Sequence, residues 1–384
     1  MYYGVHTIGR SRPLPKHKIG LRSRNLEIMY LINDQSPYRS VLDSYVAEQI
    51  PKLKTVQESD LESMFENFKP EDLISHSNVS ANELIETFRL SLITESLTDQ
   101  YADTYITGAK LADAEWLGEY ITKFWVPDEL GHADPFKNIL LDFGFSQKSL
   151  DSDIKEAKET TEYLDAHESG LHPIALTTYG MLQECITDYW YELQGQFFPR
   201  TSNTSKVISK VKGREALHTV QFRHLTALQL EADPSLITEV IHAVNKFQMP
   251  SNHIPLVKEI EEKTQEMIPR MNGEVITLLR RIIRHLNVAL NDKDMLGKLL
   301  AEYATSREQR FISLLPNHVV MEALNRITGG YGLIGEIVLD ALGLTANEAE
   351  AETTRIERVQ NFFRNIIRRW LRERLELEGF LASK

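Results

Sequence analysis

The chain has 384 residues, a formal net charge of −12 and one cysteine, Cys185. This length suits one large domain or two small ones, each with a buried core. The acidic balance argues against general nucleic-acid binding, and a single cysteine excludes a disulfide framework and a Cys-ligated zinc or iron–sulfur site. Because no apolar run approaches membrane-spanning length and no signal-peptide core is present, we expect a cytoplasmic protein.

Residues 1–79 are expected to form an N-terminal arm followed by helices. Residues 1–25 are basic and irregular around Pro13 and Pro15. This pattern is typical of an arm that packs on its own domain or on a second subunit, and we expect a homodimer. A transit peptide is the alternative, although serine is sparse for one. From Asn25 to about Leu53 the apolar residues recur at helical spacing.

Residues 80–232 are expected to form a four-helix bundle. Its helices should cover about residues 80–105, 112–143, 173–198 and 205–231. Ser80 is a good N-cap for the first helix, and a turn at Gly108 leads to the second. Pro127 should kink the second helix because it removes a helical hydrogen bond. A polar connector, residues 144–172, crosses to the third helix, which opens at His172-Pro173.

Residues 233–384 are expected to form an additional helical region packed on the bundle. Because alternating, β-branched runs are absent, we predict an all-α protein, with residues 1–384 in a single domain. Two basic clusters stand out in this region, one of Arg280, Arg281 and Arg284 and one of Arg364, Arg368, Arg369, Arg372 and Arg374. They are either solvated helix faces or a docking site for an acidic partner.

Two Glu-x-x-His steps suggest metal chemistry: Glu129 with His132, and Glu215 with His218. Residues three apart on a helix share one face, so the carboxylate and the imidazole can bind the same ion. The spacing alone is weak evidence for a metal site, because a third step, Glu239 with His242, also occurs in the chain.

A di-metal bundle requires one more inward Glu on the helix that precedes each Glu-x-x-His helix. A short loop places that Glu about thirty to thirty-five residues upstream. Glu95 fills the window for the first step and Glu184 fills it for the second, whereas the window for Glu239, residues 202–211, has no carboxylate. The predicted metal ligands are therefore Glu95, Glu129, His132, Glu184, Glu215 and His218.

This ligand set suits Fe(II) or Mn(II) and not structural zinc. Four carboxylates in one core are prohibitively costly unless cations neutralise them. Two divalent ions bring four positive charges against four negative ones, which favours two metals over one. The alternative is that these residues are surface charges that match the pattern by accident.

Four stretches occur in order over about residues 85–255: Leu92-Ile93-Thr94-Glu95, Trp125 to His132, Glu184-Cys185-Ile186-Thr187, and Met249-Pro250. They resemble motifs of the acyl-carrier-protein desaturase group of ferritin-like di-iron proteins. The second resembles that group's Trp-x-x-Glu-Glu-x-x-His stretch, with Asp128 at the first acidic position. The resemblance implies a ferritin-like four-helix bundle in which the six predicted ligands hold two iron ions. It also implies that Thr187 assists oxygen activation.

The chain departs from this group at positions beside the ligands. The group usually carries Arg before each ligand His, where this chain has Gly131 and Leu217. It usually carries an acid before each Glu of the two steps; Asp128 keeps one, and Arg214 replaces the other. Because that acid orients the imidazoles, we expect a different electron-delivery route or redox tuning. Residues 256–384 match the group poorly.

The resemblance implies an O2-dependent di-iron oxidase that acts on an unactivated C–H bond of an acyl chain, with desaturation favoured over hydroxylation. Its implied partners are an acidic acyl carrier protein, received by the basic clusters, and a ferredoxin-type electron donor. An amine N-oxygenase or an alkyl halogenase on the same bundle is the first alternative, although arylamine N-oxygenases carry an extra His where this chain has Val211. A metal-storage or structural helical protein is the second alternative.

Overall fold

The structure is a computed structural model. It describes residues 32–64, 73, 79–161, 163, 169–233, 236–256 and 275–290. All regular secondary structure in these residues is helical, which confirms the all-α class. None of the helices in these ranges has both the length and the apolar character needed to cross a bilayer. The basic arm at residues 1–25 and the cluster from Arg364 to Arg374 lie outside the described residues.

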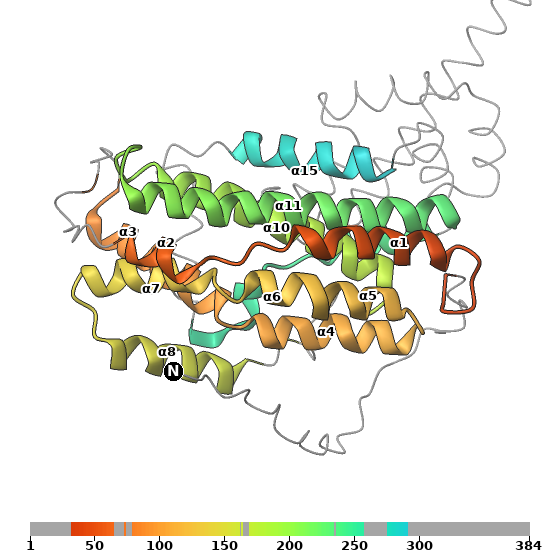
Figure 1. Ribbon diagram of the computed structural model, residues 1–384, viewed down its shortest axis with the longest axis horizontal. Coiled ribbons are helices and arrows are strands. Elements are labelled where there is room, and N and C mark those ends of the chain that lie inside the picture. The colour runs from red at the N-terminus through yellow and green to blue at the C-terminus, as the bar shows by residue number, and fades with distance from the viewer. Residues whose placement is uncertain are drawn as a thin grey trace, which may run out of the picture. The chain divides into compact units, whose positions relative to one another are not determined.

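Four helical lengths lie side by side and form the core (Figure 1). They are α3 (Ala81–Glu95) with α4 (Thr98–Leu111); α5 (Glu115–Tyr120), the π-helix η3 (Ile121–Trp125), α6 (Val126–Glu129) and α7 (Ala133–Asp142); α10 (Pro173–Gly195); and α11 (Asn203–Ala232). α3 packs on α7, α4 packs on α5 and α6, and α10 packs along α11 and also contacts α3 and α4. The last two helices begin and end within about three residues of their predicted bounds.

Further helices pack around this core. α1 (Arg39–Gln49) packs on α5 and α11, α8 (Gln147–Thr160) on α3, and α12 (Ile237–Asn245) on α10. α15 (Val275–Leu290) lies along α10 and α11 (Figure 1). Three short helices complete the described elements: η1 (Ile50–Lys52), α2 (Glu58–Glu62), which packs on α7, and η5 (Pro250–His253), which packs on α3.

The first helix begins where the sequence predicts but is interrupted inside its predicted length. The Ser80 side chain accepts a hydrogen bond from the Glu83 backbone N–H, and the Glu83 carboxylate accepts one from the Ser80 N–H. The helix then breaks after Glu95. Here the Ser96 hydroxyl donates to the Leu92 carbonyl at 2.7 Å and the Thr98 hydroxyl donates to the Glu95 carbonyl at 2.9 Å. Such bonds compete with the helical ladder.

The prediction of a turn at Gly108 is wrong, because this glycine lies inside α4. A Cβ there would lie 2.4 Å from the Leu171 carbonyl oxygen, so the position is constrained by a close approach of backbone. The turn comes at Asp113, whose φ is 50°. Asp tolerates this left-handed conformation better than most residues.

The prediction of one continuous helix over about residues 112–143 is also wrong. Pro127 has no N–H, and the π-helix before it accommodates the proline: the Val126 N–H bonds to the Ile121 carbonyl, five residues back. A second interruption falls between α6 and α7, at residues 130–132. The ring of Pro135 would clash with the Gly131 carbonyl in an unbroken helix.

α10 passes α4 and α11 at Gly180, where a Cβ would lie 2.8 Å from the Tyr105 hydroxyl oxygen and 2.9 Å from the Phe222 ring. Gly213 of α11 offers a matched control, since a Cβ there would meet nothing within 4 Å. We expect Gly180→Ala to lower the free energy of unfolding by about 1–3 kcal/mol through overpacking. Gly213→Ala should raise it by roughly 1 kcal/mol through helix propensity. Urea unfolding followed by circular dichroism measures both, and equal changes would contradict the packing argument.

Candidate metal centre

The six predicted ligands lie together in the interior of the bundle, and each comes from one of the four helical lengths. Glu95 is the last residue of α3, Glu129 is the last residue of α6, and His132 is the N-cap of α7. Glu184 lies within α10, and Glu215 and His218 lie within α11. All are buried except Glu95, which is partly exposed.

The ligand atoms form two groups, within each of which all atoms lie within 4.8 Å of one another. Position A consists of Glu95, Glu129, His132 and Glu215, and position B of Glu129, Glu184, Glu215 and His218. Each position has three carboxylates and one imidazole, and Glu129 and Glu215 are shared. Each of these groups could hold a metal ion, and the shared carboxylates suit a pair of ions.

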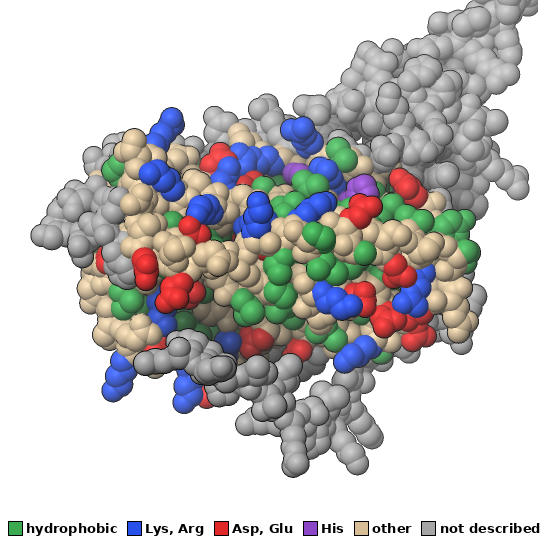
Figure 2. All heavy atoms as spheres, in the orientation of Figure 1, with side chains coloured by type: hydrophobic (Ala, Val, Ile, Leu, Met, Phe, Trp, Pro, Cys, Tyr) green, Lys and Arg blue, Asp and Glu red, His purple; other side chains and the backbone are tan. Residues whose placement is uncertain are grey.

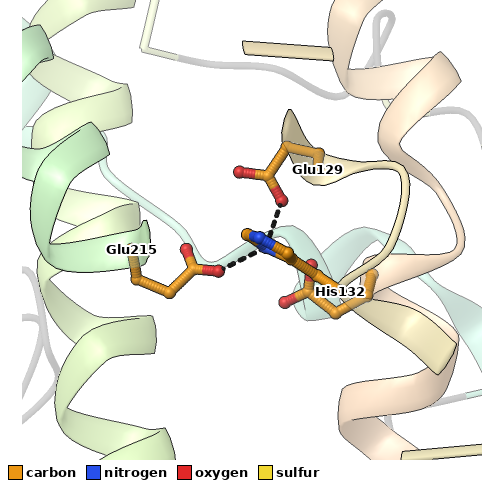
Figure 3. Close-up of side chains that lie close together, drawn as sticks. Glu129, His132 and Glu215 are labelled. Carbon is orange, nitrogen blue, oxygen red and sulfur yellow. Dashed lines mark ion pairs between the residues drawn. The ribbon is translucent and has the colours of Figure 1, made fainter. Parts of the chain in front are cut away.

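The ligand atoms approach one another closely, as Figure 3 shows for Glu129, His132 and Glu215. Several of them nevertheless form no hydrogen bond of good geometry. Nδ1 of His132 lies 3.0 Å from Oε2 of Glu129 and 2.7 Å from Oε1 of Glu215. Nδ1 of His218 lies 2.7 Å from Oε1 of Glu129. Yet both Nδ1 atoms and these two Oε1 atoms have no hydrogen-bond partner of good geometry within the described residues. Oxygen and nitrogen atoms that converge in this way, without bonding to one another, are arranged as the ligands of a metal ion would be. The residues present therefore fit the two metal ions that the sequence implies.

The carboxylates of the cluster require positive charge. No Lys or Arg of the described residues forms an ion pair with any of the four glutamates, whose ion pairs are with the two histidines alone. Burial, and then the charge of Glu129, raises the pKa of Glu95 to about 8. Burial and the charges of Glu129 and Glu184 raise the pKa of Glu215 well above its usual value. Protons or metal cations must therefore neutralise part of this cluster.

The two imidazoles have the opposite influence on the glutamate between them. Burial by itself raises the pKa of Glu129, but the charges of His132 and His218 outweigh burial and hold it below its usual value. Burial lowers the pKa of His218, yet the charge of Glu129 and the hydrogen bond that the imidazole donates to Asp128 raise it well above normal. Glu129 is thus the centre of negative charge between both positions.

Three side chains outside the ligand set bind to it directly. The Trp125 indole N–H donates to Oε1 of Glu184 at 3.0 Å, and the Tyr191 hydroxyl donates to Glu95. Nε2 of His218 lies 2.8 Å from Oδ2 of Asp128. Asp128, which the sequence predicts to orient an imidazole, therefore contacts the ring of His218. The roles of Trp125 and Tyr191 were not predicted, although Tyr191 lies seven residues after Glu184 and hence on the same face of α10.

Arg214 makes a bidentate ion pair with Asp128, which is fully buried. Its Nε lies 2.6 Å from Oδ2 and its Nη2 lies 2.7 Å from Oδ1 of the carboxylate. The same Nη2 donates to the Lys52 carbonyl, and the Lys54 N–H donates to Oδ1 of Asp128. Arg214 therefore binds Asp128, the acid that precedes the first Glu-x-x-His step. Arg214 itself precedes the second step, at the position where the desaturase pattern has an acid.

A largely apolar cavity of about 140 Å³ borders the cluster. All four ligand glutamates contribute to its wall, as do Leu90, Ile186, Trp190, Met249 and Pro250. Thr187 also lines it, one helical turn after Glu184, and its hydroxyl donates to the Gln183 carbonyl at 2.9 Å. The Met249-Pro250 pair, which the sequence resemblance includes, thus lies against the same cavity.

The third Glu-x-x-His step lies apart from the cluster. Glu239 and His242 are on α12, where Glu239 is partly exposed and His242 is exposed. Neither belongs to position A or position B. The interpretation of this step as unrelated to the metal site therefore agrees with the arrangement of the described residues.

No family model, no curated protein and no solved structure matches this chain. The helical fold and its buried Glu/His cluster are consistent with a ferritin-like di-metal site.

The pair of Arg214 and Asp128 supports a prediction about stability. We expect Arg214→Gln to lower the free energy of unfolding by about 3–5 kcal/mol, because it leaves a buried carboxylate without its cation. Arg214→Lys should recover only part of this, since an ammonium cannot bind bidentately. Lys123→Gln removes the exposed pair with Glu119 and should change stability by less than about 1 kcal/mol. Urea unfolding measures all three, and an Arg214→Gln change as small as that of Lys123→Gln would contradict the prediction.

Proposed function

We propose that this protein is an O2-dependent di-iron oxidoreductase of the acyl-carrier-protein desaturase type, which oxidises an unactivated C–H bond of an apolar chain. One observation carries the proposal: two adjacent carboxylate/imidazole groups share Glu129 and Glu215 and border a largely apolar cavity. An apolar cavity favours a hydrocarbon chain over a polar amine as the substrate. The donor set of hard carboxylates with imidazole favours iron or manganese over structural zinc.

Two iron ions held by Glu95, Glu129, His132, Glu184, Glu215 and His218 would supply reduction of O2 and the oxidising power for the C–H bond. The apolar wall of Leu90, Ile186 and Met249 would position the chain and exclude water from the carboxylates. Thr187 would hold a proton at its hydroxyl beside Glu184 during turnover. In the balanced reaction, –CH2–CH2– with O2, two electrons and two protons gives –CH=CH– and two molecules of water. A ferredoxin-type donor would supply the two electrons.

The size of the cavity limits how much of a substrate it can enclose. An apolar cavity of about 150 Å³ in another protein accommodates benzene, and the cavity here has about 140 Å³. A segment of about six carbons therefore fits beside the glutamates. The rest of a longer acyl chain, and the carrier protein that holds it, would lie beyond this space.

An acidic carrier protein would dock on a basic surface. Lys and Arg side chains gather along α11 and α15 on the face shown in Figure 2, which would attract an acidic partner. Arg281 is already engaged, because it pairs with Asp188 and Glu192 of α10. Arg284 is exposed and is therefore the better candidate for a carrier contact. The side chain of Arg280 lies outside the described residues, as does the second basic cluster.

The number of iron ions bound per chain tests the proposed metal centre. We expect the purified protein to bind two iron ions per chain, and Glu129→Ala and Glu215→Ala to lose most of both, because these residues belong to both positions. Glu239→Ala removes the same functional group outside the cluster and should leave iron content unchanged. Elemental analysis gives the stoichiometry. Retention of two irons by Glu129→Ala and Glu215→Ala would exclude this centre.

The reaction is tested by intact-mass measurement. Reduced protein with O2 and a panel of acyl carriers should yield acyl chains that have lost two hydrogens. Gain of one oxygen would indicate hydroxylation instead, and a chlorine isotope pattern would indicate halogenation. Turnover of a free amine with no change on any acyl carrier would reject the proposed substrate.

The same assay tests Thr187 against a matched control. Thr187→Val should keep its iron and lower the yield of product per O2 consumed. Thr94→Val removes a hydroxyl that likewise donates to a backbone carbonyl four residues back and lines the same cavity, but it does not follow Glu184. It should keep normal coupling, and equal losses in both variants would assign Thr187 a packing role only.

A further inference from the structure

The two histidines of the centre are held very differently. Nε2 of His218 lies 2.8 Å from Asp128, and that carboxylate is fixed by the Arg214 guanidinium and by the Lys54 N–H. His132 is equally buried, at 0% exposure, yet its Nε2 has no hydrogen-bond partner among the described residues. The imidazole of His218 is therefore fixed in orientation at its Nε2 atom, and that of His132 is not.

The backbone repeats this difference. The ligands found only in position B, Glu184 and His218, lie inside α10 and α11, which run unbroken for 23 and 30 residues. The ligands found only in position A lie at helix ends, Glu95 at the end of α3 and His132 at the interruption before α7. Glu95 and Glu184 each accept one side-chain hydrogen bond, from Tyr191 and Trp125. The asymmetry therefore rests on the histidines and on the backbone.

We propose that the two metal positions are inequivalent and are filled in order, position B before position A. This inference rests on the proposed di-metal centre. An imidazole already held by a carboxylate loses less freedom when it binds an ion and is a stronger donor. Because Glu129 and Glu215 serve both positions, an ion in position B also neutralises part of the charge that would attract the next ion.

Loss of such an outer hydrogen-bond partner typically weakens metal binding by about 10–100-fold. We therefore expect the dissociation constants of the two positions to differ by about this factor. A titration of the metal-free, full-length protein with Mn²⁺ tests this. The electron paramagnetic resonance signal of free aqueous Mn²⁺ reports the unbound ion and should resolve one tight and one weaker equivalent per chain.

Variants that lack one histidine show which position gives the tight class of Mn²⁺ binding and which gives the weaker class. Each variant retains one complete position, so an ion in one position no longer affects binding in the other. His132→Ala should retain the tight class, and His218→Ala should retain only the weaker one. Asp128→Asn should weaken the tight class by about 10–100-fold and leave the weaker class unaltered. Asp134→Asn, an exposed acid on the same segment as His132, is the control and should bind as the wild type does. Circular dichroism checks that each variant is folded. The titration of the wild type tests the inequivalence of the two positions even if a variant fails to fold.

Two equal classes in the wild type would overturn the ordering while leaving the proposed function in place. Survival of the tight class in His218→Ala, with its loss in His132→Ala, would reverse the assignment and so reject the inference. Absence of any Mn²⁺ or Fe²⁺ binding would reject both the inference and the metal centre on which the proposed function depends.

Discussion

The need to neutralise four glutamates in the interior of one helical bundle is the constraint on which the rest of the structure depends. No Lys or Arg of the described residues pairs with them, and burial raises the pKa of two of them. Such a cluster opposes folding unless protons or cations occupy it. The surrounding core compensates with large buried side chains, including Trp116, Phe88 and Phe222.

The interruptions of the helices bring the ligands of position A into place. α3 ends at Glu95, and the second helical length breaks between Glu129 and His132. A regular helix would fix the directions of these side chains by the 3.6-residue period alone. The break at residues 130–132 frees His132 from that period. The two ligands found only in position A therefore lie at helix ends, whereas the two found only in position B lie in helix interiors. The asymmetry of the centre thus originates in the backbone.

The helical class, the two later helices and the grouping of the six ligands could be predicted from sequence, because apolar periodicity and the Glu-to-Glu spacing survive local irregularity. The irregularities themselves could not. Ser96 and Thr98 gave a local hint of a break after Glu95, but hydroxyls often occur in unbroken helices. Gly108 looked like a turn, and only the neighbouring Leu171 carbonyl explains it. Such tertiary contacts have no trace in the local sequence.

Gly131 and Arg214 lie far apart in the sequence but belong to one structural feature. Residues 52–57 pass beside the break after Glu129, where a Cβ on Gly131 would lie 3.0 Å from Cβ of Val56. The same segment receives Arg214 at its Lys52 carbonyl and gives its Lys54 N–H to Asp128. A side chain at position 131 would require Val56 to shift, and an acid at position 214 would remove the cation that pairs with Asp128 and the donor to the Lys52 carbonyl. Gly131 therefore leaves room for this segment and Arg214 holds it against the centre. The arginine at position 214 supplies no carboxylate to Nε2 of His132, which has no hydrogen-bond partner among the described residues.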